Sequence, residues 1–255
     1  MRAAGKVPKN ANDWNPIRDP EEFFSTGIPD FDRLLDGGFR RGSMPLLEMD
    51  ETVGLEDLDL LLFPTHLNFL YQSRGMITVL PSRDSPHAFR SRLTRFATRR
   101  RFDGRVRVVD YAGDDEGLSY VVNIRGPSSN SKATERAIAP MEAAERAVRG
   151  NRKKAFIELT AFEVFDTLMG PEAALRMFFH GIKRVRQPGN LGIGLLGPGL
   201  GCAAGVRRMV DTAFALHREE VGLVIRGVHP AFSGHVVSPD PRAGLPRVAF
   251  VPKPS

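Results

Sequence analysis

Short apolar segments alternate with segments of helical periodicity from Phe23 almost to the C-terminus. Strands that alternate with helices in this way are typical of a mostly parallel central sheet flanked by helices. The sequence therefore predicts an α/β fold. The expected strands are Met44–Met49, Met76–Pro81, Val106–Tyr111, Ala155–Leu159 and Gly192–Leu196, and the expected helices are Ile28–Leu35, Leu58–Tyr71, one from Ser85 to just before Asp103, Ala133–Val148 and Pro171–Arg186.

The last third of the chain predicts a different kind of strand pairing. Thr212–His217, Gly222–Val228 and Arg247–Val251 read as strands joined by hairpins or longer turns, so we expect antiparallel strands at the C-terminal end. Residues 1–20 are rich in proline, asparagine and lysine and predict a flexible basic arm. Residues 21–255 show no repeat and no change of composition before a proline-rich tail, which favours a single domain.

Composition argues against several classes of protein. No apolar run approaches the roughly 20 residues of a membrane-spanning helix, so no membrane partner is expected. The N-terminus lacks the apolar region of a secretory signal. The one cysteine, Cys202, cannot form an internal disulfide and fits a reducing compartment, so we expect a cytoplasmic protein. The histidines show no i, i+4 pairs and no cysteine cluster accompanies them, so no metal site is predicted.

One segment resembles a known family. Residues 25–43 read STGIPDFDRLLDGGFRRGS, which is similar to the segment that leads into the first core strand of KaiC-like and RadA-like ATPases of the RecA superfamily. The order of later features agrees, with Ser85-Pro86 after the second core strand and a strand at Ala155–Leu159 in the position of Walker B. The resemblance spans roughly residues 23 to 251 and implies a single RecA-like domain.

The phosphate-binding loop of that family departs from its pattern here. In the motif G-x-x-x-x-G-K-[ST], backbone N–H groups surround the phosphates, the lysine contacts them and the hydroxyl binds magnesium. In the alignment implied by the resemblance, Met49 stands at the first glycine, Leu55 at the lysine and Glu56 at the hydroxyl residue, and only Gly54 remains. A carboxylate beside phosphate oxygens adds repulsion of about 4 kcal/mol per close pair at an effective dielectric near 20. We therefore expect no ATP in the familiar pose and no nucleotide cofactor.

The same segment suggests what replaces the phosphate. Glu56 and Asp57 fall in the first turn of the helix that follows the loop, where free N–H groups and the helix dipole favour a negative group. We hypothesise that carboxylates of the chain occupy the anion site.

Two further positions depart from the ATPase pattern. By resemblance, the paired acids that activate water correspond to Arg83-Asp84, so one of the two acids is an arginine. The Walker B aspartate corresponds to Glu158, a carboxylate that could still hold a cation. Together with the altered loop, these positions argue against hydrolysis, and no catalytic residue is predicted.

Arginines are concentrated between residues 90 and 107, in a chain with a net charge of +6. A solvated helix face and a nucleic-acid surface both explain such a cluster, which includes Arg99, Arg100 and Arg101. Arg207 and Arg208 follow a glycine-rich turn, in a place similar to a DNA-facing loop of recombinases with this fold. No aromatic residue stands there to stack on bases.

These observations favour a non-catalytic RecA-fold protein that acts as a structural or regulatory subunit. The resemblance implies partners of the same fold, either copies of this chain or a RecA-family relative. A DNA-binding recombinase relative without its own hydrolysis is the alternative, and an atypical nucleotide-binding ATPase is a third reading.

Overall fold

The computed structural model describes residues 14–111, 117–123, 133–149, 154–186, 189–241 and 245–253. Its centre is a ten-stranded sheet in the order β12-β11-β10-β9-β3-β8-β7-β4-β5-β6. All pairs from β9 to β6 are parallel, and β9 to β12 pair antiparallel. The strands are β3 (Leu46–Met49), β4 (Gly75–Val79), β5 (Val106–Asp110), β6 (Val121–Asn123), β7 (Phe156–Ala161), β8 (Leu191–Leu196), β9 (Ala213–Glu219), β10 (Gly222–His229), β11 (Phe232–Pro239) and β12 (Val248–Pro252). The predicted α/β class, with a mostly parallel sheet and antiparallel C-terminal strands, is confirmed.

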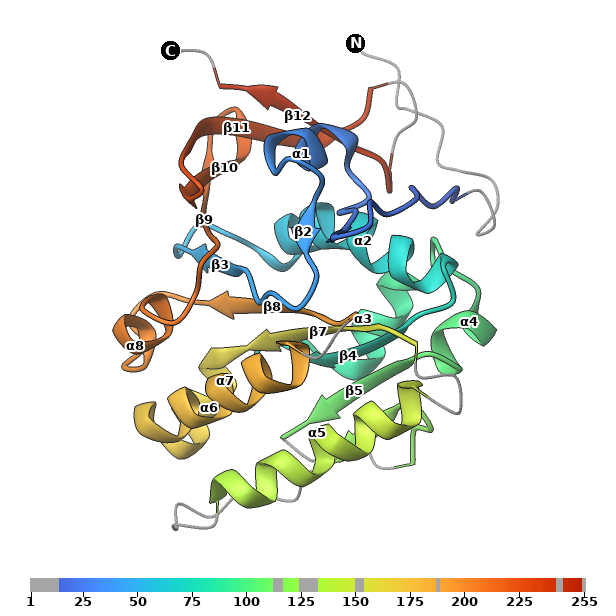
Figure 1. Cartoon of the computed structure of the whole chain (residues 1–255), viewed down its shortest axis with the longest axis vertical. Coiled ribbons are helices and arrows are strands. Elements are labelled where there is room, and N and C mark those ends of the chain that lie inside the picture. Colours follow the sequence, from blue (N-terminus) through green and yellow to red (C-terminus); the bar gives the residue numbers. More distant parts are fainter. Residues whose placement is uncertain are drawn as a thin grey trace.

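Helices cover both faces of the sheet (Figure 1). The helices are α1 (Pro29–Leu34), α2 (Leu55–Tyr71), α3 (Pro86–Leu93), α4 (Arg99–Asp103), α5 (Ala133–Arg149), α6 (Phe162–Met169), α7 (Pro171–Arg186) and α8 (Ala203–Arg207). One core cluster holds the buried side chains of α1 to α4, and a second holds those of α5 to α8. Strands β4, β7 and β8 are buried along their whole length, as expected of strands enclosed on both faces. Among the described residues no helix is both long and apolar enough to cross a membrane.

The segment that resembles the RecA family is fixed by one aspartate. The Asp32 carboxylate accepts hydrogen bonds from Ser25 Oγ, from Thr26 N at 2.7 Å and from Thr26 Oγ1 at 2.6 Å. Gly27 has φ +78°, and a Cβ there would lie 2.4 Å from the Pro64 carbonyl oxygen, so only glycine fits. The motif therefore folds back on α1 and packs against α2. Two short antiparallel strands, β1 (Phe23–Phe24) and β2 (Phe39–Arg40), pair on either side of this motif in the sequence.

Several boundaries differ from the prediction. Helix α2 begins at Leu55, three residues earlier than expected, because a carboxylate stabilises its first turn. The helix expected from Ser85 to Asp103 is two helices, since Thr98 caps α4 by accepting a hydrogen bond from Arg101 N at 3.2 Å. Helix α8 forms within the expected glycine-rich turn, and α6 and β11 were not predicted.

Candidate functional site

The loop between β3 and α2, residues 50–54, lies where the resemblance places a phosphate-binding loop. Its last residue, Gly54, donates its backbone N–H to Asp57 Oδ2 at 2.9 Å. Asp57 is the third residue of α2 and is buried, and its other carboxylate oxygen, Oδ1, pairs with the Arg218 guanidinium from β9. A carboxylate of the chain therefore occupies the free N–H end of this helix.

Other protein groups fix the rest of this loop. Arg83, in the turn after β4, donates from Nη2 to the Val53 carbonyl oxygen at 2.8 Å. The backbone N–H of Arg218 donates to Thr52 Oγ1 at 2.7 Å, and Thr52 N donates to Asp50 Oδ1 at 2.8 Å. The loop is thus held by side-chain and backbone contacts to the turn after β4 and to the end of β9.

The residues at the family's motif positions face different surroundings. Met49 is buried in the core at the end of β3, and Leu55 packs against the same cluster. Glu56 instead lines an open cavity of about 410 Å³, together with Phe63, Phe96 and Arg95. At the helix start, the Gly54 N–H donates to the Asp57 carboxylate, and the Leu58 N–H donates to the Gly54 carbonyl oxygen at 3.2 Å.

Asp84 belongs to a partly buried ionic triad. Arg92, on α3, contacts Asp84 through Nη1 at 3.0 Å and Nη2 at 2.6 Å, and contacts Asp59, on α2, through Nε at 2.5 Å. The Asp84 side chain is only 3% exposed. Burial raises the pKa of Asp59 to about 6, although Arg92 opposes the shift, and the two carboxylates raise the pKa of Arg92. One arginine therefore binds both Asp84 and Asp59.

Glu158 does not lie beside the loop. It stands in the middle of β7, is 1% exposed, and forms a two-pronged pair with Arg184 of α7 at 2.7 and 3.1 Å. Successive strand residues point to opposite faces, and its neighbours Ile157 and Leu159 belong to the core cluster on the α2 face. The structure therefore places the Glu158 side chain on the face of the sheet opposite α2, where it pairs with Arg184 of α7.

The predicted arginine clusters lie apart. Arg101 stacks on Tyr71, with the guanidinium carbon 3.9 Å from the ring centre, and donates to the Leu70 carbonyl, whereas Arg99 and Arg100 are exposed. Arg207 pairs with Glu48 at 2.8 Å, and Arg208 donates to the Ala204 carbonyl. Helices α4 and α8, which carry these clusters, lie on opposite sides of the molecule in Figure 1, so they form no single surface there.

Three features of this region were missed in the sequence. The contacts of Arg92 with Asp59 and of Arg218 with Asp57 carry no local signal, because they join residues 33 and 161 positions apart. His66 follows Leu58 and Leu62 at intervals of four residues, on the same apolar face of α2. This spacing predicts only that His66 lies in the core. Both His66 ring nitrogens are buried without a hydrogen-bond partner, and burial lowers the pKa of His66 to about 3.

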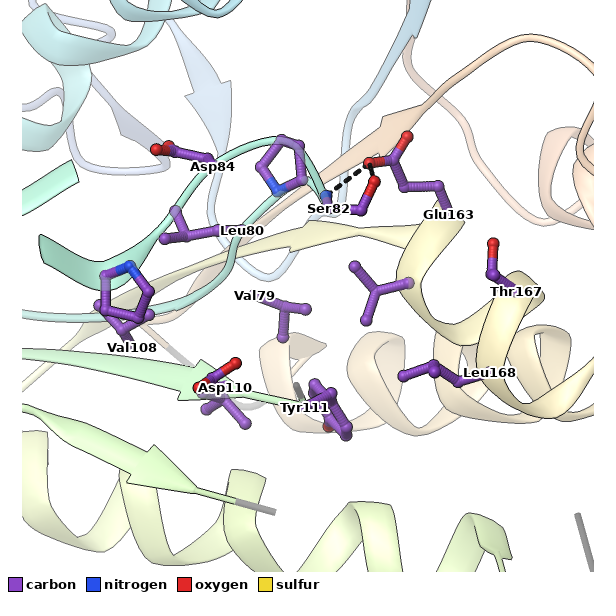
Figure 2. Close-up of a pocket in the computed structure, with 14 residues that line it drawn as sticks. Val79, Leu80, Ser82, Asp84, Val108, Asp110, Tyr111, Glu163, Thr167 and Leu168 are labelled. Atoms are coloured by element: carbon purple, nitrogen blue, oxygen red, sulfur yellow. Dashed lines mark hydrogen bonds between the residues drawn. The ribbon is translucent and has the colours of Figure 1, made fainter. Parts of the chain in front are cut away.

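A cavity of about 220 Å³ opens at the carboxyl ends of β4 and β5 (Figure 2). Its lining extends from Val79 through Asp84 to Tyr111 and to Glu163 and Leu168 of α6. Within the described ranges, no group of three histidine, cysteine, aspartate or glutamate side chains is arranged to hold a metal ion.

Comparison with known proteins places this geometry in context. The family model described as "GvpD basic region 2" matches residues 13–149, which include the loop, Arg83, Asp84 and Arg92. Protein GvpD2 of Halobacterium salinarum is 29% identical over 173 residues, 64% of this chain and 35% of that protein. Protein GvpD1 of the same organism is 35% identical over 104 residues, 40% of this chain and 19% of that protein. The match thus spans about a third or less of these curated relatives.

Two solved structures share the fold. An uncharacterized protein of Pyrococcus horikoshii, PH0321, crystallised with an unknown peptide, has a TM-score of 0.65 and 14% identity and covers 91% of this chain and all of that chain. The KaiC-like protein PH0186 of Pyrococcus horikoshii OT3 has a TM-score of 0.60 and 15% identity and covers 93% of this chain and all of that chain. The RecA-like fold implied by the resemblance is confirmed.

Proposed function

Because this chain belongs to the GvpD basic region 2 family and has a KaiC-like fold, we propose that it is a non-catalytic RecA-fold protein that acts as a structural or regulatory subunit. It works by association with copies of itself or with a RecA-family relative. One observation carries the proposal: the Asp57 carboxylate takes the Gly54 N–H at the start of α2, where an active relative would present N–H groups to phosphate.

The electrostatics of the loop support this proposal. A phosphate at the helix start would have to displace Asp57 and would meet Glu56, Glu51 and Asp50 nearby in sequence. The phosphate would have no lysine to pair with, because Leu55 stands at the lysine position of the motif and packs against the core. Repulsion of about 4 kcal/mol for each close anionic pair outweighs the gain from a single backbone N–H.

The surroundings of the loop support the absence of hydrolysis. The acid pair that would activate water is represented by Arg83, which holds the Val53 carbonyl, and by Asp84, which is bound to Arg92. Neither side chain is placed to accept a proton from a water molecule at the loop. A general base has to reach the proton that it abstracts, so hydrolysis lacks its base in this arrangement.

Sedimentation velocity with and without Mg–ATP tests the mode of action. We expect an assembly larger than one chain, alone or mixed with an active RecA-family relative, whose size does not change when Mg–ATP is added. A monomer under all these conditions would contradict the assembly proposal, and an assembly that forms only with Mg–ATP would contradict the proposed independence from nucleotide.

The alternative, a DNA-binding RecA relative, is favoured by one observation. Arg99 and Arg100 on α4 are exposed, and among the described residues neither has a side-chain hydrogen bond or ion pair. If they contact phosphates, duplex affinity will fall steeply with salt and will weaken in the Arg99→Ala/Arg100→Ala variant. The Arg33→Ala variant, which changes an exposed arginine on α1, is the matched control. Fluorescence anisotropy measures both.

A further inference from the structure

The cavity at the carboxyl ends of β4 and β5 has predominantly apolar walls. Six aliphatic side chains form them: Val79, Leu80, Val108, Val109, Val164 and Leu168. Figure 2 shows Tyr111 and Asp110 on the β5 side and Leu168 and Thr167 on the α6 side. Leu168 is 42% exposed, so the cavity opens to solvent past an apolar side chain. Concave apolar sites at the ends of parallel strands are common ligand sites in α/β proteins.

The charged side chains among the described lining residues of this cavity are all carboxylates. Asp84, Asp110 and Glu163 line it, and no lysine, arginine or histidine stands among these described residues, although the chain as a whole carries a net charge of +6. Asp84 is neutralised by Arg92. Asp110 of β5 also interacts with another group of the protein, so Glu163 of α6 is the carboxylate available to a ligand.

Ser82 orients the Glu163 side chain through one of its two carboxylate oxygens. Its Oε1 accepts hydrogen bonds from Ser82 N at 2.7 Å and Ser82 Oγ at 2.9 Å. In the described structure no hydrogen bond reaches its Oε2, and a carboxylate can accept several. Ser82 therefore orients the carboxylate without neutralising it.

We propose that this cavity binds a small organic cation, an ammonium or guanidinium group carried on an apolar body. The aliphatic walls would bury the apolar body, and Glu163 Oε2 would accept a hydrogen bond from the cation. The cation is either a free amine or the side chain of a lysine or arginine in another protein. This inference does not depend on whether the β3–α2 loop binds nucleotide.

Titration with 2-phenylethylamine, followed by heteronuclear NMR of the folded chain, tests the site. We expect saturable shifts of backbone amides in residues 79–84, 108–111 and 163–168, and an affinity at least tenfold higher than that of neutral 2-phenylethanol. Equal affinity for the two probes, or shifts elsewhere only, would overturn the proposal. A second titration uses lysine and arginine whose termini are acetylated and amidated. If these bind, the natural ligand is a lysine or arginine side chain of a protein. If only 2-phenylethylamine binds, the natural ligand is a small free amine.

Two variants separate the cavity from the fold. Glu163→Gln keeps an oxygen that accepts from Ser82 and removes the charge, so the preference for the amine over the alcohol should fall about tenfold. Val164→Phe fills the cavity and should abolish the binding of both probes. Glu172→Gln, an exposed change on α7, is the control and should leave both affinities unaltered. Unchanged binding in Val164→Phe, with the native NMR spectrum retained, would refute the site.

Discussion

Replacement of Asp57 tests the claim that a carboxylate of the chain stabilises the loop. In Asp57→Ala, the Gly54 N–H loses its acceptor and Arg218 loses its partner. Loss of a side-chain cap costs about 1 kcal/mol, and loss of a negative charge at a helix N-terminus costs roughly 0.3–1 kcal/mol. Because the Arg218 side chain is 54% exposed, its ion pair adds less than about 1 kcal/mol.

The expected total is therefore a loss of about 2 kcal/mol in the free energy of unfolding. For a domain of this size that corresponds to a fall in Tm of roughly 4–8 °C. Asp57→Asn keeps an oxygen acceptor and should lose about half as much. Urea unfolding monitored by circular dichroism measures both losses.

Glu56→Gln is the matched control, since it changes the neighbouring carboxylate, which faces the open cavity. It should alter stability by less than about 0.5 kcal/mol. If Asp57→Ala costs no more than Glu56→Gln, the carboxylate does not hold the helix start, and the explanation of the loop fails.

Three further outcomes are expected. Arg92→Met should cost about 3 kcal/mol in urea unfolding, because it leaves the buried Asp84 carboxylate and the partly buried Asp59 carboxylate without a counter-charge, whereas the exposed Arg95→Met should cost little. Burial lowers the pKa of His66 below its unfolded value of 6.5, so its contribution to stability is present above pH 6.5 and is lost as the pH falls toward 3. Between pH 7 and pH 5 the wild type should therefore lose about 2 kcal/mol more than His66→Leu in urea titrations, and equal losses would argue against a buried neutral imidazole. Burial and Asp166 raise the pKa of the Cys202 thiol to about 12, so the folded chain should react with iodoacetamide at pH 8 far more slowly than the unfolded chain.

The fold could be predicted from the sequence because its signals are local. The strands β4, β7 and β8 are mostly apolar runs, and Asp32 accepts hydrogen bonds from Ser25 and Thr26 within residues 25–43. Strand β11 was missed because serine, glycine and histidine interrupt its apolar pattern. Its stability comes from pairing with β10 and β12, which no local pattern reveals.

The site was predictable only in part, because local sequence patterns do not reveal contacts between residues that are distant along the chain. Asp57 was expected in the first turn of α2, and there it does accept a hydrogen bond. Glu158 lies in a strand buried on both faces, where the apolar run gives no indication of which face a residue points to. The contact between Arg218 and Asp57 joins residues 161 positions apart, so only the pairing of β3 with β9 brings them together.

Calorimetric titration of the folded chain with Mg–ATP tests the central claim most directly. We expect no saturable heat at millimolar nucleotide, because Asp57 and its acidic neighbours occupy the helix start and Arg83 and Arg218 fix the loop around it. Saturable binding of one ATP per chain, weakened by Gly54→Val in the loop, would contradict the account.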